Sequence, residues 1–344
     1  MEVLRFCSSG AFSIRLPWIE SIPLALREVR WQYNVVNPMK AFVAVTDNDW
    51  FRFLRARPEL DEVNFWQPSG RTKFKALTPG EPFLFKLHRP DDYVVGGGFF
   101  AHFSLLPHRL AWDFFEEKNG AATFEEMDKR IRRYRRVKYE ARDFTIGCIL
   151  LSEPFFFTEE DWIPVPRDWK MNIVQGKGYD LASGLGARLW DEVQLRLHGQ
   201  LVAERSEIKQ TSLYAEPVLV RPRMGQGIFR TVVTDTYERR CAVTGEKALP
   251  ALDAAHIRSV KDGGRHLVEN GLLLRSDVHR LFDAGYVTVT KDYRFRVSRL
   301  LKDDFDNGEP YYPFNGKEIW LPKRAEARPR REYLEWHADT VFRG

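Results

Sequence analysis

The segment between residues 241 and 290 limits the fold of this 344-residue chain more than any other, because short apolar runs alternate there with isolated polar residues. The run ALDAAHI ends at His256 and is typical of a strand, and a loop with two adjacent glycines follows. Asn270 then opens a second apolar run, NGLLL, and His279 falls in the first turn of a predicted helix. The sequence therefore predicts strand, loop, strand and helix, with one polar residue from each part able to converge.

These residue types suit the hydrolysis of a phosphodiester bond. The reaction needs a base that activates water and a cation that neutralises charge on the leaving oxygen. Histidine suits the base, since its unperturbed pKa of about 6.5 lies near neutral pH. The alternative is three unrelated polar residues around a small core. The order of His256, Asn270 and His279, at spacings of fourteen and nine residues around a Gly-Gly pair, favours a nuclease site.

The same pieces resemble an HNH endonuclease domain of the ββα-metal type. They are Asp253–Ile257, Asn270–Leu274 and Asp277–Asp283. The resemblance implies that His256 is the general base and that His279 binds a divalent metal, Mg²⁺ or Mn²⁺. It also implies that Asn270 either braces the loop that orients His256 or contacts the metal.

One position departs from this pattern. Many HNH enzymes carry Asp, Glu or His directly before the base as a metal ligand, and this chain has Ala255 there. Asp253 lies two residues earlier and faces the same side of a strand as Ala255. We expect Asp253 to be the replacement ligand.

Two basic stretches are candidates for contacts with DNA phosphates. Arg221, Arg223 and Arg230 surround the start of a helix upstream of the nuclease segment, where backbone amides also favour phosphate. An ordinary exposed linker explains them equally well. Residues 129–138 hold seven basic residues in ten, which indicates either a phosphate contact or a solvated helix face.

The pattern of residues 39–197 is mixed α and β. It runs through a strand, a helix, an aromatic loop, the turn LTPGE and a strand containing Val-Gly-Gly. This order resembles the PUA superfamily, especially its EVE-like members. The resemblance implies a small curved β-barrel flanked by helices, a fold in which several branches bind a flipped, modified base in an aromatic pocket.

The aromatic loop is our candidate for that pocket. Asn64, Phe65, Trp66 and Ser69 combine flat rings with polar tips, which is what holding a base outside the stack requires. The alternative is that these rings belong to the core, because an aromatic content of 14% must be buried somewhere.

The sequence thus predicts an α+β protein with four parts. Residues 1–38 are an N-terminal extension, which is either a genuine arm or a leader upstream of a start at Met39. Residues 39–197 are the PUA/EVE-like domain, 198–220 a linker and 221–344 the HNH domain.

Charge and composition limit the classes of molecule that the chain is expected to bind. A net charge of +5 and a pI near 9.0 suit a polyanion. The three cysteines form no CxxC pair, so no zinc clamp is expected, and the absence of a long apolar run or signal peptide favours the cytoplasm and no membrane partner.

These features lead to the hypothesis of an endonuclease that senses modified cytosine by base flipping and cuts double-stranded DNA. One HNH site cuts one strand, so we expect a homodimer on DNA. The alternatives are an HNH nuclease for unmodified or structured nucleic acid, with a generic binding domain, and a non-catalytic RNA-binding protein. The intact His256, Asn270 and His279 argue against the last alternative.

Overall fold

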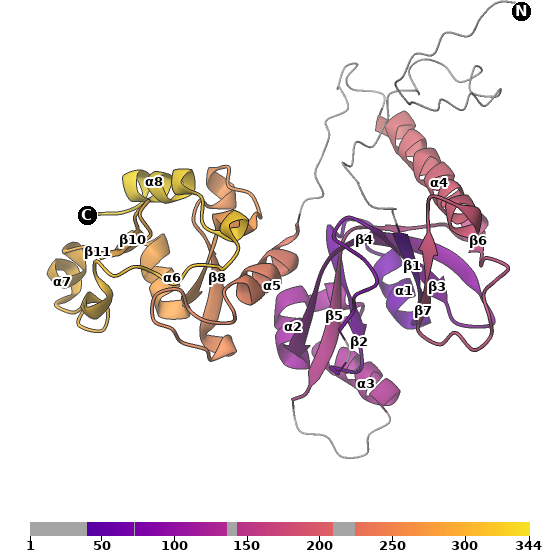
Figure 1. Ribbon diagram of the computed structural model, residues 1–344, viewed down its shortest axis with the longest axis horizontal. Helices are drawn as coiled ribbons and strands as arrows, with labels where there is room; N and C mark the ends of the chain where they lie inside the picture. The colour runs from indigo at the N-terminus through magenta and orange to yellow at the C-terminus, as the bar shows by residue number, and fades with distance from the viewer. Residues whose placement is uncertain (1–39, 72, 136–142, 209–223) are drawn as a thin grey trace, which may run out of the picture. The chain divides into compact units, whose positions relative to one another are not determined.

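The computed structural model describes residues 40–71, 73–135, 143–208 and 224–344. For residues 198–208 it describes the backbone alone. The predicted extension 1–38 lies outside these ranges. In the described part of the chain, no helix is long and apolar enough to span a membrane. The α+β class is confirmed: a mixed sheet with helices forms the first domain, and a small β and α unit follows it (Figure 1).

The first domain is built on one mixed sheet with the neighbour order β2-β5-β4-β3-β1-β7, in which β6 pairs with β4. Its strands are β1 (Lys40–Thr46), β2 (Glu62–Gln67), β3 (Pro82–Leu87), β4 (Tyr93–Pro107), β5 (Thr145–Phe156), β6 (Ile163–Pro164) and β7 (Gly176–Asp180). The β1–β3 pair is parallel and the others are antiparallel. Among the described strands, β2 and β7 are the edges of this sheet and no hydrogen bonds join them.

Strand β2 corrects the prediction of an aromatic loop. Residues 62–67 form a strand that pairs with β5 in antiparallel register, Val63 opposite Leu151 and Trp66 opposite Cys148. The polar residues of this stretch indicated a loop, but Val, Phe and Trp are strong strand formers and β5 offers a buried partner. The pairing therefore outweighs the local polar signal.

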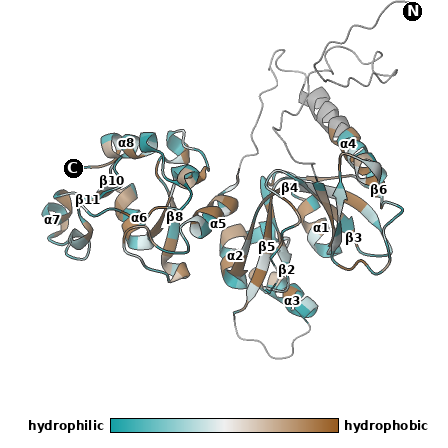
Figure 2. Ribbon diagram, viewed as in Figure 1, coloured by the Kyte–Doolittle hydropathy of each residue, from teal (hydrophilic) through white to brown (hydrophobic). Residues whose placement is uncertain are grey.

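Helices cover this sheet. They are α1 (Asn48–Arg55), α2 (His108–Phe115), α3 (Phe124–Arg135) and α4 (Gly184–Ile208). The Asp47 side chain caps α1 by accepting a hydrogen bond from the Trp50 amide at 2.8 Å. Figure 2 shows the hydrophilic ribbon of α3 beside the more hydrophobic β5. Because α4 continues to Ile208, the first part of the predicted linker 198–220 is helical.

The second domain has the predicted order of strand, loop, strand and helix. Its elements are α5 (Gln226–Thr236), β8 (Leu252–His256), β9 (Gly271–Arg275), α6 (Ser276–Asp283), β10 (Val287–Val289), β11 (Phe295–Val297), α7 (Leu300–Phe305) and α8 (Arg331–Thr340). Strands β8 and β9 are antiparallel, with His256 opposite Gly271. Helix α6 follows β9 directly, so it begins beside the start of β8, where Leu252 is opposite Arg275.

Helix α5 contributes to two hydrophobic cores. Ile228 packs into the core of the first domain, while Phe229 and Val233 pack into the core of the second domain. Positions 228 and 229 lie on neighbouring faces of a helix, so one helix can serve both cores. The buried carboxylate of Glu62 accepts hydrogen bonds from the amides of Gly227 and Ile228, at 2.7 and 2.8 Å. It thereby satisfies donors that a helix start leaves unpaired.

Candidate active site

His256 ends β8, and its ring is held on one face and at one edge. The ring of Phe229 stacks on it with centroids 4.0 Å apart and planes 10° apart. Its Nε2 lies 3.0 Å from Nδ1 of His266, and in the described part of the chain Nδ1 of His256 makes no hydrogen bond. Burial, with smaller contributions from His266, His279 and Arg230, lowers the pKa of His256 to about 4. The ring is therefore neutral at neutral pH, and one nitrogen can accept a proton.

Asn270 is buried and ties together the loop between β8 and β9. Its Oδ1 accepts a hydrogen bond from the Arg258 amide at 2.9 Å. Its Nδ2 donates to the carbonyl oxygens of Arg258, at 2.9 Å, and Arg265, at 3.0 Å. All three contacts go to the backbone of the loop that follows His256. They favour the bracing role over a contact with metal.

His279 lies on α6 between two carboxylates. Its Nδ1 is 3.4 Å from an oxygen of Asp253, and its Nε2 is 3.3 Å from an oxygen of Asp283. Burial raises the pKa of Asp283; the charge of His279 opposes this shift and that of Asp253 adds to it. Asp283 was not among the predicted ligands, although its position four residues after His279 on one helix face is a sequence signal for the contact.

The Asp253–His279 pair fits part of a metal centre. Two ligands that bind one ion through bonds of about 2.1 Å lie roughly 3 Å apart when adjacent, close to the observed separation. No group of three His, Cys, Asp or Glu side chains within the described ranges forms a complete centre. One imidazole and one carboxylate therefore suit a cation whose other ligands are water and phosphate oxygens, as Mg²⁺ sites commonly are.

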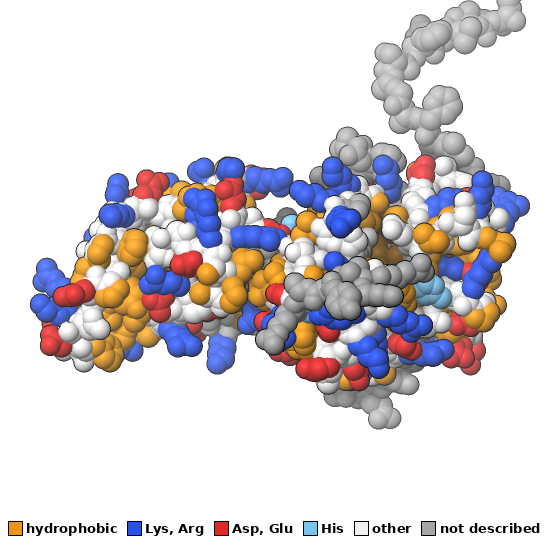
Figure 3. Space-filling view, turned by 90° about the horizontal axis from the view of Figure 1, so that it is seen from below, with side chains coloured by type: hydrophobic (Ala, Val, Ile, Leu, Met, Phe, Trp, Pro, Cys, Tyr) orange, Lys and Arg blue, Asp and Glu red, His pale blue; other side chains and the backbone are white. Residues whose placement is uncertain are grey.

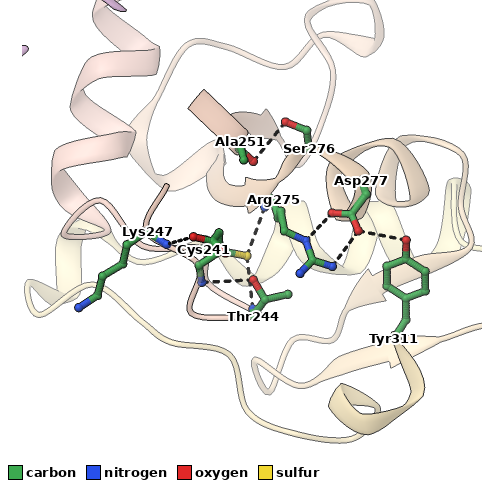
Figure 4. Close-up of polar contacts among 9 residues, drawn as sticks. Cys241, Thr244, Lys247, Ala251, Arg275, Ser276, Asp277 and Tyr311 are labelled. Atoms are coloured by element: carbon green, nitrogen blue, oxygen red, sulfur yellow. Dashed lines mark hydrogen bonds and ion pairs between the residues drawn. The ribbon is translucent and has the colours of Figure 1, made fainter. Parts of the chain in front are cut away.

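A polar network fixes the start of α6 (Figure 4). Arg275 donates two hydrogen bonds to the carboxylate of Asp277, both at 2.7 Å, and the Tyr311 hydroxyl donates to the same carboxylate at 3.1 Å. The bonds from Arg275 are the main cause of the lowered pKa of Asp277. The Ser276 hydroxyl donates to the Ala251 carbonyl at 3.2 Å. His279 is thereby held by a helix anchored to the segment before β8.

The residues of the predicted base pocket do not face one place, because alternate residues of β2 face opposite sides of the sheet. Asn64 and Trp66 are buried, and both donate hydrogen bonds to Asn119, at 2.9 and 3.0 Å. They are core residues and are not available to a ligand. Ser69 lies beyond the strand and is exposed. Phe65 lines a cavity.

That cavity lies on the other face of β2 and has a volume of about 130 Å³. Four rings and two amide side chains line it: Phe42, Phe65, Phe74, Phe83, Gln67 and Gln175. Lys73 and Lys75 also line it and are exposed. Sequence patterns missed this set because its members come from β1, β2, β3 and two loops. Only Phe65 and Gln67, which lie two residues apart on β2, are close enough in the sequence to indicate a shared site.

Of the three arginines near α5 that are predicted to contact phosphate, the structure describes one. Arg230 lies on α5 and is close enough to His256 to lower its pKa, whereas Arg221 and Arg223 lie outside the described residues. On α3, Arg132 pairs with Asp128 at 2.7 Å and Arg130 donates to the Gly120 carbonyl at 2.6 Å. Figure 3 shows Lys and Arg scattered among acidic side chains on the visible face. For these two arginines, contacts within the domain favour the structural interpretation.

Comparison with known proteins confirms the nuclease prediction. Residues 241–290 match the family model described as HNH endonuclease, so the chain contains a domain of this family of phosphodiester hydrolases. Such nucleases typically use a divalent metal. A search of curated protein sequences gives no match.

Two solved structures are also similar. The ASCH protein from Zymomonas mobilis is 11% identical, with 44% of this chain and 94% of that chain covered and a TM-score of 0.30. The modification-dependent TagI restriction endonuclease is 14% identical, with 82% of this chain and 75% of that chain covered and a TM-score of 0.25. At these identities and scores, neither likeness assigns a role to a residue of this chain.

Proposed function

We propose that the chain is a DNA endonuclease in which His256 is the general base and Asp253 and His279 hold a divalent cation. One observation carries this proposal. His256, with Nδ1 free, and the Asp253–His279 pair are both positioned by the β8–β9–α6 unit, within the segment that matches HNH endonucleases. Base and cation ligands thus belong to one small scaffold.

The residues divide the reaction between them. His256 takes a proton from water at Nδ1, and the hydroxide attacks the phosphorus atom of the backbone. The cation, when bound, neutralises charge on the leaving oxygen. Asn270 braces the loop that follows the base. We propose that Arg230, whose charge acts on His256, contacts a phosphate oxygen. One such site cuts one strand, so we propose that two copies act on a duplex.

The finer proposal concerns selectivity. Contacts to phosphates carry no base identity, so the choice of DNA falls to the first domain. Flipping a base costs a few kcal/mol, and stacking returns about 1–3 kcal/mol for each base. The cavity beside β2 offers rings for stacking and the amides of Gln67 and Gln175 for a base edge. We propose that it receives a flipped, modified cytosine.

Digestion of matched duplexes tests both parts. The substrates contain cytosine, 5-methylcytosine or 5-hydroxymethylcytosine at the same positions, with Mg²⁺ or Mn²⁺ present. We expect metal-dependent cleavage that is faster on one modified duplex. Equal rates on all three would support the alternative of a generic binding domain, and no cleavage of any duplex would contradict the nuclease proposal.

A further inference from the structure

His266 contacts the ring of the proposed base, yet the HNH motif as predicted from the sequence gives it no role. Its Nδ1 lies 3.0 Å from Nε2 of His256, and the two rings meet edge to face with centroids 4.9 Å apart. His266 is partly exposed on the loop between β8 and β9. The contact therefore joins a loop side chain to the catalytic end of a strand.

Only one hydrogen atom fits between two facing ring nitrogens, and a neutral imidazole has one donor and one acceptor. If His256 donates from Nε2, its Nδ1 has a free lone pair and can take a proton from water. If His256 accepts at Nε2, its Nδ1 carries the hydrogen and cannot act as a base. The direction of this hydrogen bond therefore decides whether His256 is competent at Nδ1.

The surroundings hold both partners in place. Phe229 stacks on His256 and also contacts the ring of His266, with centroids 5.6 Å apart. Asn270 holds the carbonyl of Arg265, the residue directly before His266, at 3.0 Å. The same amide that braces the loop thus fixes the backbone next to His266, so the pairing is built into the fold of the loop.

We propose that His266 is a positioning residue that accepts a hydrogen bond at Nδ1 from Nε2 of His256 and so keeps Nδ1 of His256 free to deprotonate water. The inference rests on the proposed function, in which His256 is the base. After the transfer, the proton from water is on Nδ1 of His256, and Nε2 still donates to His266. His266 gains no proton but stabilises the charged ring, as a hydrogen-bond acceptor does in other histidine bases.

Three substitutions differ in where they leave an acceptor. His266→Asn places an amide oxygen at the position of Nδ1, His266→Gln moves it one bond further, and His266→Leu removes it. Long-range ¹H–¹⁵N NMR spectra of the metal-free full chain report the tautomer of His256. We expect the Nε2–H tautomer in the wild type and His266→Asn, and a mixture in His266→Gln and His266→Leu.

Single-turnover cleavage with Mg²⁺ provides the second measurement. We expect losses of about 10- to 100-fold for His266→Gln and His266→Leu, the range seen when the partner of a functional histidine is removed, and near wild-type cleavage for His266→Asn. An Nδ1–H tautomer in the wild type, or equal behaviour of the Asn and Gln variants, would overturn the inference. If His266→Leu does not fold, the Asn and Gln pair still decides the question.

His256→Ala separates this inference from the proposed function. If His256→Ala cuts normally, the assignment of the base fails and the positioning role fails with it. If His256→Ala is inactive while all three His266 variants cut like the wild type, the base assignment holds and only the positioning role is lost.

Discussion

The proposed catalytic site and the cavity of the first domain gather different kinds of side chain. Around His256 and His279, imidazoles and carboxylates face one another at 3.0–3.4 Å. Around Phe65, four rings enclose about 130 Å³ with two amide side chains and no acidic group. The first arrangement can move protons and hold a cation, whereas the second can stack on a flat molecule and read its edge.

This difference supports the proposed division of work between the two domains. The nuclease site has titratable groups, and its proposed phosphate contacts do not distinguish bases. The cavity has recognition surfaces but no base or metal ligand. Helix α5 belongs to both cores. Its Ile228 packs in the first core, and the next residue, Phe229, packs in the second core and stacks on His256.

The largest expected effect is on the base. His256→Ala should lower the cleavage rate by about 10²–10⁴-fold, because the water loses its proton acceptor. The affinity for DNA should change little, since the imidazole acts on water. Single-turnover cleavage and fluorescence anisotropy with the same duplex measure the two quantities. Cleavage within about threefold of the wild type, far below the loss expected for a general base, would contradict the assignment.

The next effect is on the metal ligands. We expect His279→Ala and Asp253→Asn each to weaken Mg²⁺-dependent cleavage by more than about tenfold and to raise the Mg²⁺ concentration for half-maximal rate. Asp283→Asn is the matched comparison, because Asp283 contacts the other nitrogen of His279. If Asp283→Asn shifts the Mg²⁺ dependence and Asp253→Asn does not, the ligand is Asp283.

Much of the catalytic site could be predicted from sequence, because its residues lie within about thirty positions on consecutive elements. Asp253 lies beside His279, and Asn270 holds the loop that follows His256. The contact of His266 could not be predicted, since it depends on how the loop folds back onto β8. The roles of these residues stay predictions that the experiments above test.

The cavity was less accessible to prediction. The sequence predicts a loop at Asn64–Trp66, whereas these residues lie in a strand. Strand alternation then sends Trp66 into the core while Phe65 faces the cavity. The other rings come from strands that become neighbours only through the order of the sheet. Local patterns contain no such long-range register.

Substitutions of Trp66 and Phe65 compare the two faces of β2 in the first domain. Trp66→Ala should lower the free energy of unfolding by about 3–5 kcal/mol, because it removes a buried ring and leaves the Asn119 carbonyl without its donor. Phe65→Ala should cost less stability, because the ring borders a cavity. Chemical denaturation of both variants measures the difference. A larger loss for Phe65→Ala would place the core on the other face of β2.

A smaller effect concerns pH. His337 is buried, with contacts to Thr288 at 2.9 Å and the Phe282 carbonyl at 3.1 Å, and burial lowers its pKa to about 4. The folded state then binds fewer protons than the unfolded state between about pH 4 and 6.5, so stability is full above pH 6.5 and falls as the pH drops. The loss is at most about 3 kcal/mol, since one pKa unit corresponds to about 1.4 kcal/mol.

Melting temperatures of the wild type and His337→Gln between pH 7 and pH 4 test this prediction. The melting temperature of the variant should be lower than that of the wild type at pH 7 and should fall less on acidification. His88→Gln, at an exposed position, controls for the general effect of acid on the chain. If the melting temperatures of the wild type and His337→Gln fall equally with pH, His337 does not contribute to the loss of stability in acid.

The most direct test of the division of work is a double measurement on three proteins: the wild type, His256→Ala and Gln67→Ala. For each protein, the cleavage rate and the affinity are measured on a modified and an unmodified duplex. We expect His256→Ala to lose cleavage on both duplexes and to keep the affinity ratio. We expect Gln67→Ala to keep slow cleavage of the unmodified duplex and to lose the preference for the modified one. If Gln67→Ala keeps full discrimination, or if His256→Ala loses it, the cavity does not select the DNA that the nuclease domain cuts.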